Sequence, residues 1–215
     1  MIELMNVFGS SWIVERRFDE LVREIAAKEE SSLRFKAKAL AVSEIANQYY
    51  CEKKVELNRI HGEEETFEMR LGKEGHELLL KDAVRIKRRD LLRKISSGEP
   101  VMVREMLLLG KHGSTIVAGV PDIVLFHRGL PIFLFEHKFP SRQIPFRHHH
   151  VQARLYCYLL QLMGWETKKL KYVLVIAPPE CRGDNDLRRI PSYVLRQPSE
   201  TRLRVKLQAG DANLY

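Results

Sequence analysis

Two short motifs near the middle of the chain combine residue types that could bind a metal ion and activate water. The first ends in Pro121-Asp122, and the second is Glu136-His137-Lys138. Carboxylate oxygens are the ligands that hard divalent cations such as Mg²⁺ and Mn²⁺ prefer. Lys138 stands one strand period after Glu136, so it shares a face with Glu136, and its ammonium could orient or activate a water for attack on phosphate. The motifs predict a metal site with Asp122 and Glu136 as ligands, which the His137 carbonyl could complete.

The two motifs must be brought together by a β-hairpin. The apolar stretch Ile123–His127 is typical of a buried strand, Arg128-Gly129-Leu130 supplies a turn, and Pro131–Lys138 returns as the second strand. A three-residue turn places Asp122 opposite Glu136, where directly opposed Cβ atoms lie about 5 Å apart. Two carboxylates at that spacing repel each other unless a cation lies between them. An edge hairpin with ordinary charged residues is the plainer interpretation, but these charges end an apolar run that is typical of an interior strand.

Other polar residues are placed where they could support this site. His76 lies early in a helical stretch and could be a third ligand, although a lone histidine is as often a surface or core residue. Gln152 and Tyr156 are four residues apart and share one helical face, where they could contact phosphate or orient Lys138. The run His148-His149-His150 begins this helix, and we expect it to face a DNA groove or solvent. The expected core stripe of the same helix consists of Val151, Leu155, Leu159 and Leu162.

Composition narrows the class of protein and its partners. The 215 residues can bury one substantial core, and 36 Lys and Arg against 28 Asp and Glu give a net charge of +8. This excess is typical of a protein that binds a polyanion such as DNA, although solvated helix surface could also account for part of it. Basic residues gather in Arg85–Lys94, Arg142–Arg154, Lys168–Lys171 and Arg202–Lys206. No apolar run is long enough to span a membrane and no signal-peptide pattern is present, so we expect a soluble cytoplasmic protein without membrane contact.

The periodicity of the chain predicts an α/β fold with a central mixed β-sheet flanked by helices. Helices are expected over Trp12–Ala27, from an N-cap at Ser43, over about Glu64–Ile95 and over Phe146–Met163. Besides the hairpin, strands are expected over Val101–Leu109, Ser114–Ala118 and Lys171–Ala177, and near Ser192–Arg196 and Arg202–Leu207. The helical residues 1–98 would form an N-terminal elaboration carrying the His76 motif, and 99–215 would form the core, both within one compact domain.

These motifs, in this order, resemble those of the RecB-like exonucleases of the PD-(D/E)XK nuclease superfamily, in particular the CRISPR-associated branch (the Cas-four type). The match spans about 42–177, and its four motifs are Gly72–His76, Gly119–Asp122, Glu136–Lys138 and Gln152–Tyr156. The resemblance implies a restriction-endonuclease-like core and a metal-dependent DNA exonuclease acting on single-stranded or end-containing DNA, in DNA repair, DNA processing or CRISPR adaptation. It also implies that His76 is a metal ligand and that Gln152 and Tyr156 hold the substrate or Lys138. Partners would be DNA, a second copy of the chain, or CRISPR adaptation proteins.

The cysteines depart from this branch, whose members usually hold an iron–sulfur cluster with four cysteines. The chain has only Cys51, Cys157 and Cys181, which are too few and wrongly placed for that ligation. We therefore expect no iron–sulfur cluster, no disulfide framework, and a buried, apolar role for Cys51. Two alternatives stay open at this stage. One is a non-catalytic DNA-binding adaptor subunit, and the other is a structure-specific endonuclease such as a junction resolvase.

Overall fold

The structure is a computed structural model, and it describes residues 2–29, 33, 36–63, 70, 73, 77, 83–138, 145–176 and 206–211. The helices in these residues are α1 (Ile2–Ala27), α2 (Val42–His61), α4 (Arg88–Ser96) and α5 (Arg147–Met163). The strands are β1 (Leu40–Ala41), β2 (Val101–Arg104), β3 (Leu108–His112), β4 (Thr115–Gly119), β5 (Ile123–His127), β6 (Leu130–Lys138), β7 (Lys171–Ile176) and β8 (Lys206–Asp211). The predicted combination of helices and mixed sheet is confirmed.

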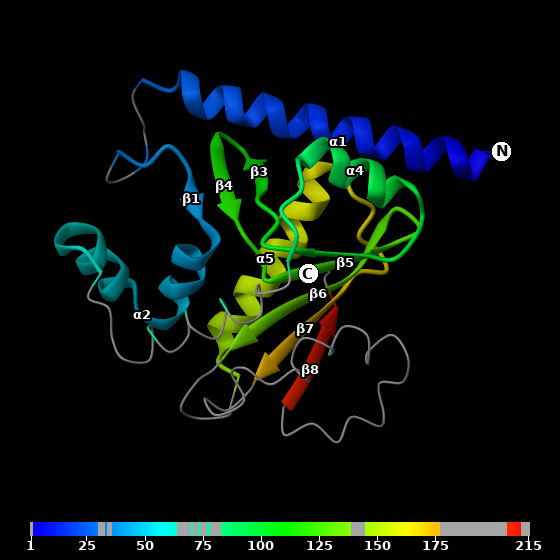
Figure 1. Cartoon of the computed structure of the whole chain (residues 1–215). Coiled ribbons are helices and arrows are strands. Elements are labelled where there is room, and N and C mark those ends of the chain that lie inside the picture. Colours follow the sequence, from blue (N-terminus) through cyan, green and yellow to red (C-terminus); the bar gives the residue numbers. More distant parts are fainter. Residues whose placement is uncertain are drawn as a thin grey trace.

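The strands form two sheets, and α5 lies between them. The larger sheet has the order β2-β5-β6-β7-β8, in which only the β6–β7 pair is parallel. The smaller sheet has the order β1-β4-β3, with β1 parallel to β4 and β3 antiparallel to it. Helix α5 packs against strands of both sheets and against α2, while α1 crosses the outer side of the molecule (Figure 1). One helix therefore connects every layer of the fold.

The hairpin of β5 and β6 has a different turn from the predicted one but keeps the predicted alignment of its ends. The turn has two residues, Arg128 and Gly129, with φ values of 51° and 77°, as a type I′ turn requires. A bulge next to Phe126 then shifts the register by one residue, so that Ile123 pairs with Phe135. The shorter turn and the bulge compensate for each other. Extending this register by one residue places Asp122 opposite Glu136.

The expected single strand Val101–Leu109 is instead two strands in different sheets. Strand β2 pairs with β5 in the larger sheet, whereas β3 pairs with β4 in the smaller one. Between them, Glu105 adopts a φ of 49°, and its backbone N–H donates to the carbonyl of Asp122 at 3.1 Å. A residue with this positive φ cannot continue a strand, so the chain turns away from β5 at this point. The apolar pattern alone did not reveal the break.

The N-terminal region also differs in detail from the expected elements. Helix α1 begins at Ile2 rather than at Trp12. Helix α2 begins after Ala41, so Ser43 is an exposed helical residue and not the N-cap. The predicted continuous helix over 64–95 is wrong at its C-terminal part, because residues 83–87 are not helical and α4 begins separately after its N-cap Lys87. Most of residues 64–82 lie outside the described residues. Strand β1 pairs with β4, so the region 1–98 contributes a strand to a sheet of the region 99–215.

The C-terminal strands are only partly covered by the structure. Strand β8 covers Lys206–Asp211, later in the chain than the expected Arg202–Leu207, and it closes the larger sheet beside β7. The expected strand near Ser192–Arg196 lies outside the described residues, as does Cys181.

Two predictions about buried residues are wrong. Cys51 is exposed rather than buried, because it lies at a kink inside α2 where its φ of −162° interrupts the helix. The core stripe of α5 is also rotated from the expected one. Of the four expected residues only Leu159 is fully buried, and the buried residues of α5 are His149, Ala153, Tyr156, Cys157, Leu159, Leu160 and Met163. This rotation directs Tyr156 and its neighbours toward the strands rather than toward the surface.

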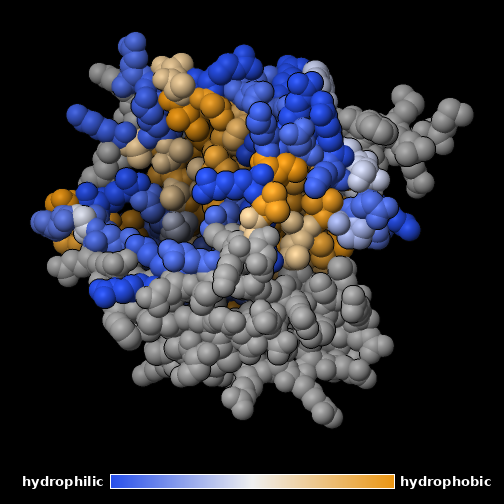
Figure 2. Space-filling model, viewed as in Figure 1, coloured by the Kyte–Doolittle hydropathy of each residue, from blue (hydrophilic) through white to orange (hydrophobic). Residues whose placement is uncertain are grey.

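The described surface is largely hydrophilic. On the face shown in Figure 2, hydrophilic side chains surround smaller groups of exposed hydrophobic ones. Among the described helices, none combines the length and the apolar composition that crossing a membrane would require.

Candidate active site

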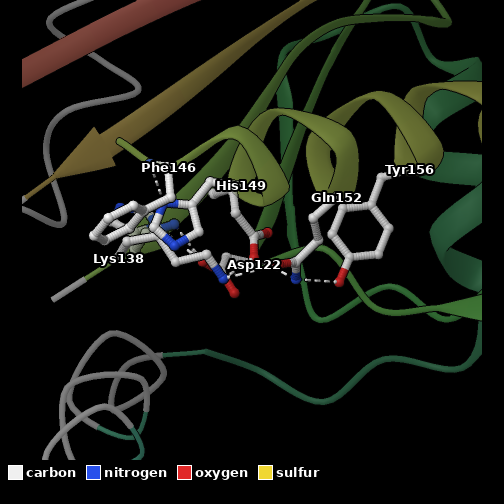
Figure 3. A network of polar contacts seen from close by, with 8 residues as sticks. Asp122, Lys138, Phe146, His149, Gln152 and Tyr156 are labelled. Carbon is white, nitrogen blue, oxygen red and sulfur yellow. Dashed lines mark hydrogen bonds and ion pairs between the residues drawn. The ribbon is translucent and has the colours of Figure 1, made fainter. Parts of the chain in front are cut away.

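Glu136, Lys138 and Gln152 form a closed triangle of hydrogen bonds between β6 and α5. Lys138 Nζ donates to Glu136 Oε1 at 2.8 Å and to Gln152 Oε1 at 3.1 Å. Gln152 Nε2 donates to the same Glu136 oxygen at 2.8 Å. An ammonium only donates and a carboxylate only accepts, so only one orientation of the Gln152 amide satisfies both neighbours. Figure 3 shows Gln152 reaching from α5 toward this network.

Tyr156 lies one helical turn after Gln152 and extends the network into the core. Its hydroxyl accepts a hydrogen bond from Gln152 Nε2 at 3.0 Å (Figure 3). Burial, together with the negative charges of Glu136 and Asp122, raises the pKa of Tyr156 far above its ordinary value. The phenol is therefore neutral at physiological pH, and it fixes the Gln152 amide rather than carrying charge.

Gly119, the glycine before Val120-Pro121-Asp122, is explained by its contact with this tyrosine. A Cβ atom added at Gly119 would lie 2.6 Å from the Tyr156 ring and 2.7 Å from the Val42 side chain. Both distances are shorter than real Cβ contacts allow. The glycine thus permits α5 and α2 to approach the end of β4, which holds Tyr156 beside the hydrogen-bonded triangle.

Asp122 occupies the position opposite Glu136 that the sequence predicts. Its Oδ2 accepts a hydrogen bond from the backbone N–H of His137 at 2.5 Å, and its side chain is only 12% exposed. The negative charge of Asp122 also acts on Lys138 and Tyr156, raising the pKa of both. The structure therefore brings Asp122 and the triangle into one small region between β5, β6 and α5.

The electrostatic state of Lys138 follows from competing effects. Burial by itself lowers the pKa of this ammonium, but the charges of Glu136 and Asp122 and the hydrogen bond to Glu136 together raise the pKa above its usual value. Lys138 is therefore a cation in this structure. It can donate hydrogen bonds and stabilise negative charge, but it cannot accept a proton near neutral pH.

His149 was not among the expected site residues and lies directly beside them. Its ring is 6% exposed, and its Nδ1 accepts the backbone N–H of Phe146 at 3.3 Å, which caps the start of α5 (Figure 3). Burial, and then the positive charge of Lys138 and the neighbouring histidines, lowers the pKa of His149 to about 3. The expectation that the whole run of histidines faces solvent or a groove is wrong for this residue. The signal for its burial was its helical spacing from Ala153 and Tyr156.

The two remaining predicted ligands, the side chain of His76 and the backbone carbonyl of His137, stay predictions. His76 lies outside the described residues, so its role as a ligand stays a prediction. The imidazole of His137, which was not the predicted ligand, is fully buried, and its Nδ1 lies 3.4 Å from Asp122 Oδ2. Within the described part of the chain, no three or more acidic, histidine or cysteine residues are grouped so that they could hold a metal ion. Asp122 and Glu136 provide a pair of hard oxygen donors that suits Mg²⁺ or Mn²⁺.

Comparisons with known proteins add little to this geometry. Neither the models of known protein families nor the curated protein sequences contain a match to the chain. Among solved structures, the crystal structure of SSO0001 is similar with a TM-score of 0.40 and 14% sequence identity, covering 95% of this chain and 78% of that one.

Replacing Gly119 by Ala should destabilise the protein, because the new Cβ would overlap the Tyr156 ring. Overpacking of this kind costs about 1–3 kcal/mol. We expect a lower midpoint of urea unfolding, followed by tyrosine and tryptophan fluorescence. Gly113→Asn is the matched control, since Gly113 has no neighbour within 4 Å and its φ of 58° is one that Asn tolerates. An unchanged midpoint in Gly119→Ala would contradict the close approach of α5 to β4.

The low pKa of His149 predicts a loss of stability in acid. In the unfolded chain its pKa is near 6.5, so below that pH the unfolded state binds the proton that the folded state excludes. Stability is therefore complete above about pH 6.5 and decreases as the pH falls toward the folded pKa of about 3. Between pH 7.5 and pH 5, wild type should lose about 1–2 kcal/mol more than His149→Asn, measured by urea unfolding at both pH values. His61→Asn, an exposed change on α2, should follow wild type. Equal losses in all three proteins would contradict this assignment.

Proposed function

We propose that the protein is a metal-dependent deoxyribonuclease, an exonuclease that hydrolyses phosphodiester bonds. The observation that carries this proposal is the triangle of Glu136, Lys138 and Gln152, with Asp122 opposite Glu136. Two carboxylates and one ammonium converge at the end of an otherwise apolar strand, where burying charges is costly. The charges of Glu136 and Asp122 raise the pKa of Lys138, and perturbed protonation in such a setting is typical of catalytic sites.

Each residue of the site has a definite part in this proposal. Asp122 and Glu136 would hold Mg²⁺ or Mn²⁺ through their carboxylate oxygens, with His76 as the expected further ligand. When bound, the ion would stabilise negative charge on the phosphate and on the leaving oxygen. Lys138 would orient the attacking water through its N–H groups. Gln152 would hold the Lys138 ammonium and the Glu136 carboxylate in fixed positions relative to each other.

The substrate class comes from charge and from the resemblance of the motifs to RecB-like exonucleases. Single-stranded or end-containing DNA in the cytoplasm is the proposed substrate, in DNA repair, DNA processing or CRISPR adaptation. Arg147 is exposed at the start of α5, next to the site, and could contact the phosphates that flank the scissile one. Arg142 lies outside the described residues. Because such contacts release counterions, binding of DNA should weaken steeply as salt is raised.

Lys138→Met and Asp122→Asn should each lower the Mn²⁺-dependent degradation of an end-labelled single strand by at least about 100-fold. Lys138→Met removes the donor that orients water, and Asp122→Asn removes a ligand charge. Lys168→Met is the matched control, because Lys168 has a side chain 87% exposed and lies outside the site. Retention of degradation in both site variants, with circular dichroism spectra like that of wild type, would refute the proposal.

The same substrates separate the proposal from its alternatives. A DNA-binding adaptor would bind the strand but degrade none of it with Mg²⁺ or Mn²⁺. A structure-specific endonuclease would cut circular or branched DNA, whereas an exonuclease needs a free end. Removing metal with EDTA should stop degradation, and adding Mn²⁺ should restore it. Calorimetry should show that wild type binds Mn²⁺ and that Asp122→Asn binds it more weakly.

A further inference from the structure

Several aromatic rings are exposed at the point where α2 meets the start of α5. Tyr49 and Tyr50 lie just before the kink in α2 and are 58% and 65% exposed. Phe146, the N-cap residue of α5, is 38% exposed. Large rings are usually buried for most of their area, so exposing three of them in one place is costly in water.

Contacts join these rings into one surface. The ring of His148 lies 5.4 Å from that of Tyr50 in an edge-on arrangement, and 5.7 Å from that of Phe146 with only 12° between the ring planes. The guanidinium of Arg147 lies 5.8 Å from the centre of the Tyr49 ring. Helix α2 packs against α5, so the rings are held on two rigid helices. We call Tyr49, Tyr50, Phe146 and His148 the aromatic surface.

The aromatic surface adjoins the proposed active site. Phe146 is in edge contact with His149, at 5.6 Å between ring centres, and both lie beside Lys138 in Figure 3. Burial, followed by the charges of Lys138 and Lys54, lowers the pKa of His148, which places both cations within electrostatic reach of the surface.

The charges around the aromatic surface favour the binding of a polyanion. Arg147 and Lys54 are exposed basic residues there, whereas Lys53 and Glu56 neutralise each other in a pair at 3.1 Å. Glu52 is an exposed acidic residue of the same turn. Positive charge next to exposed ring faces is the combination found where proteins bind single-stranded nucleic acid.

We propose that the aromatic surface stacks the unpaired bases of the DNA strand whose phosphate enters the site at Asp122, Glu136 and Lys138. This inference rests on the proposed function and adds a base-binding site to it. Every base presents a flat π face to an aromatic ring, so the surface would bind without regard to sequence. In a duplex those faces are covered by neighbouring base pairs, so an unpaired segment is required.

Binding of a fluorescent fifteen-nucleotide oligothymidine, measured by anisotropy in EDTA to prevent cleavage, tests the stacking directly. Wild type should bind it at least tenfold more tightly than an abasic strand of equal length, because each stacked base contributes about 5- to 150-fold. The double variant Tyr49→Ala/Tyr50→Ala should lose that preference. Tyr49→Phe/Tyr50→Phe should keep it, since stacking needs the ring and not the hydroxyl. Trp12→Ala, which removes an aromatic side chain 61% exposed on α1, should bind as wild type does.

Equal binding of the normal and abasic strands by wild type would overturn the inference. The inference would also be overturned if Tyr49→Ala/Tyr50→Ala kept the preference for the normal strand over the abasic one. The exposed rings would then be assigned to contact with a protein partner instead. Loss of this preference in both the alanine and the phenylalanine double variants would also overturn the inference, because the phenylalanine rings can still stack. Cleavage by wild type in Mn²⁺ is scored separately. Base-dependent binding without cleavage would refute the proposed nuclease activity but support the base-binding site. Cleavage without base-dependent binding would support the nuclease activity but refute the base-binding site.

Discussion

The arrangement of the site depends on keeping the ammonium of Lys138 charged where a sheet meets a helix. The side chain of Lys138 is 22% exposed and that of its partner Glu136 only 3%. With so little water around them, each charge is stabilised mainly by the opposite charge of its partner. Removing one member of such a pair leaves a charge without compensation and costs about 3–5 kcal/mol. The helix that covers the pair must therefore offer a group that accepts from the ammonium and donates to the carboxylate. The amide of Gln152 does both through two separate atoms, accepting at Oε1 and donating from Nε2.

The sequence was sufficient to place Asp122 opposite Glu136, although the turn between them was predicted incorrectly. The register matters because a slip of one residue would turn Glu136 to the other face of the sheet. The two-residue turn at Arg128 would by itself cause such a slip, and the bulge next to Phe126 cancels it. Local residue types indicated the turn only approximately, and the bulge next to Phe126 restores the register that the longer turn would have produced.

What the sequence did not reveal depends on contacts between distant segments. The turn at Glu105 is held by the carbonyl of Asp122, which no local pattern in Val101–Leu109 can show. The exposure of Cys51 follows from the kink in α2, while the general tendency of cysteine to be buried pointed the other way. The place of His149 at the start of a helix predicts that it faces a groove or solvent. Its burial follows from the packing of α5 between two sheets, which its spacing from Ala153 and Tyr156 alone indicates only in part.

The contacts that stabilise the fold are also the contacts that form the site. Gly119 lies three residues before Asp122 and touches the ring of Tyr156, whose hydroxyl holds Gln152, which in turn holds Lys138. Motifs far apart in the sequence are thus linked by one continuous chain of packing and hydrogen bonds. A change anywhere along that chain alters both the packing of α5 and the position of the ammonium. The packing at the end of β4 and the position of the ammonium at the end of β6 are therefore coupled through side chains of the single helix α5.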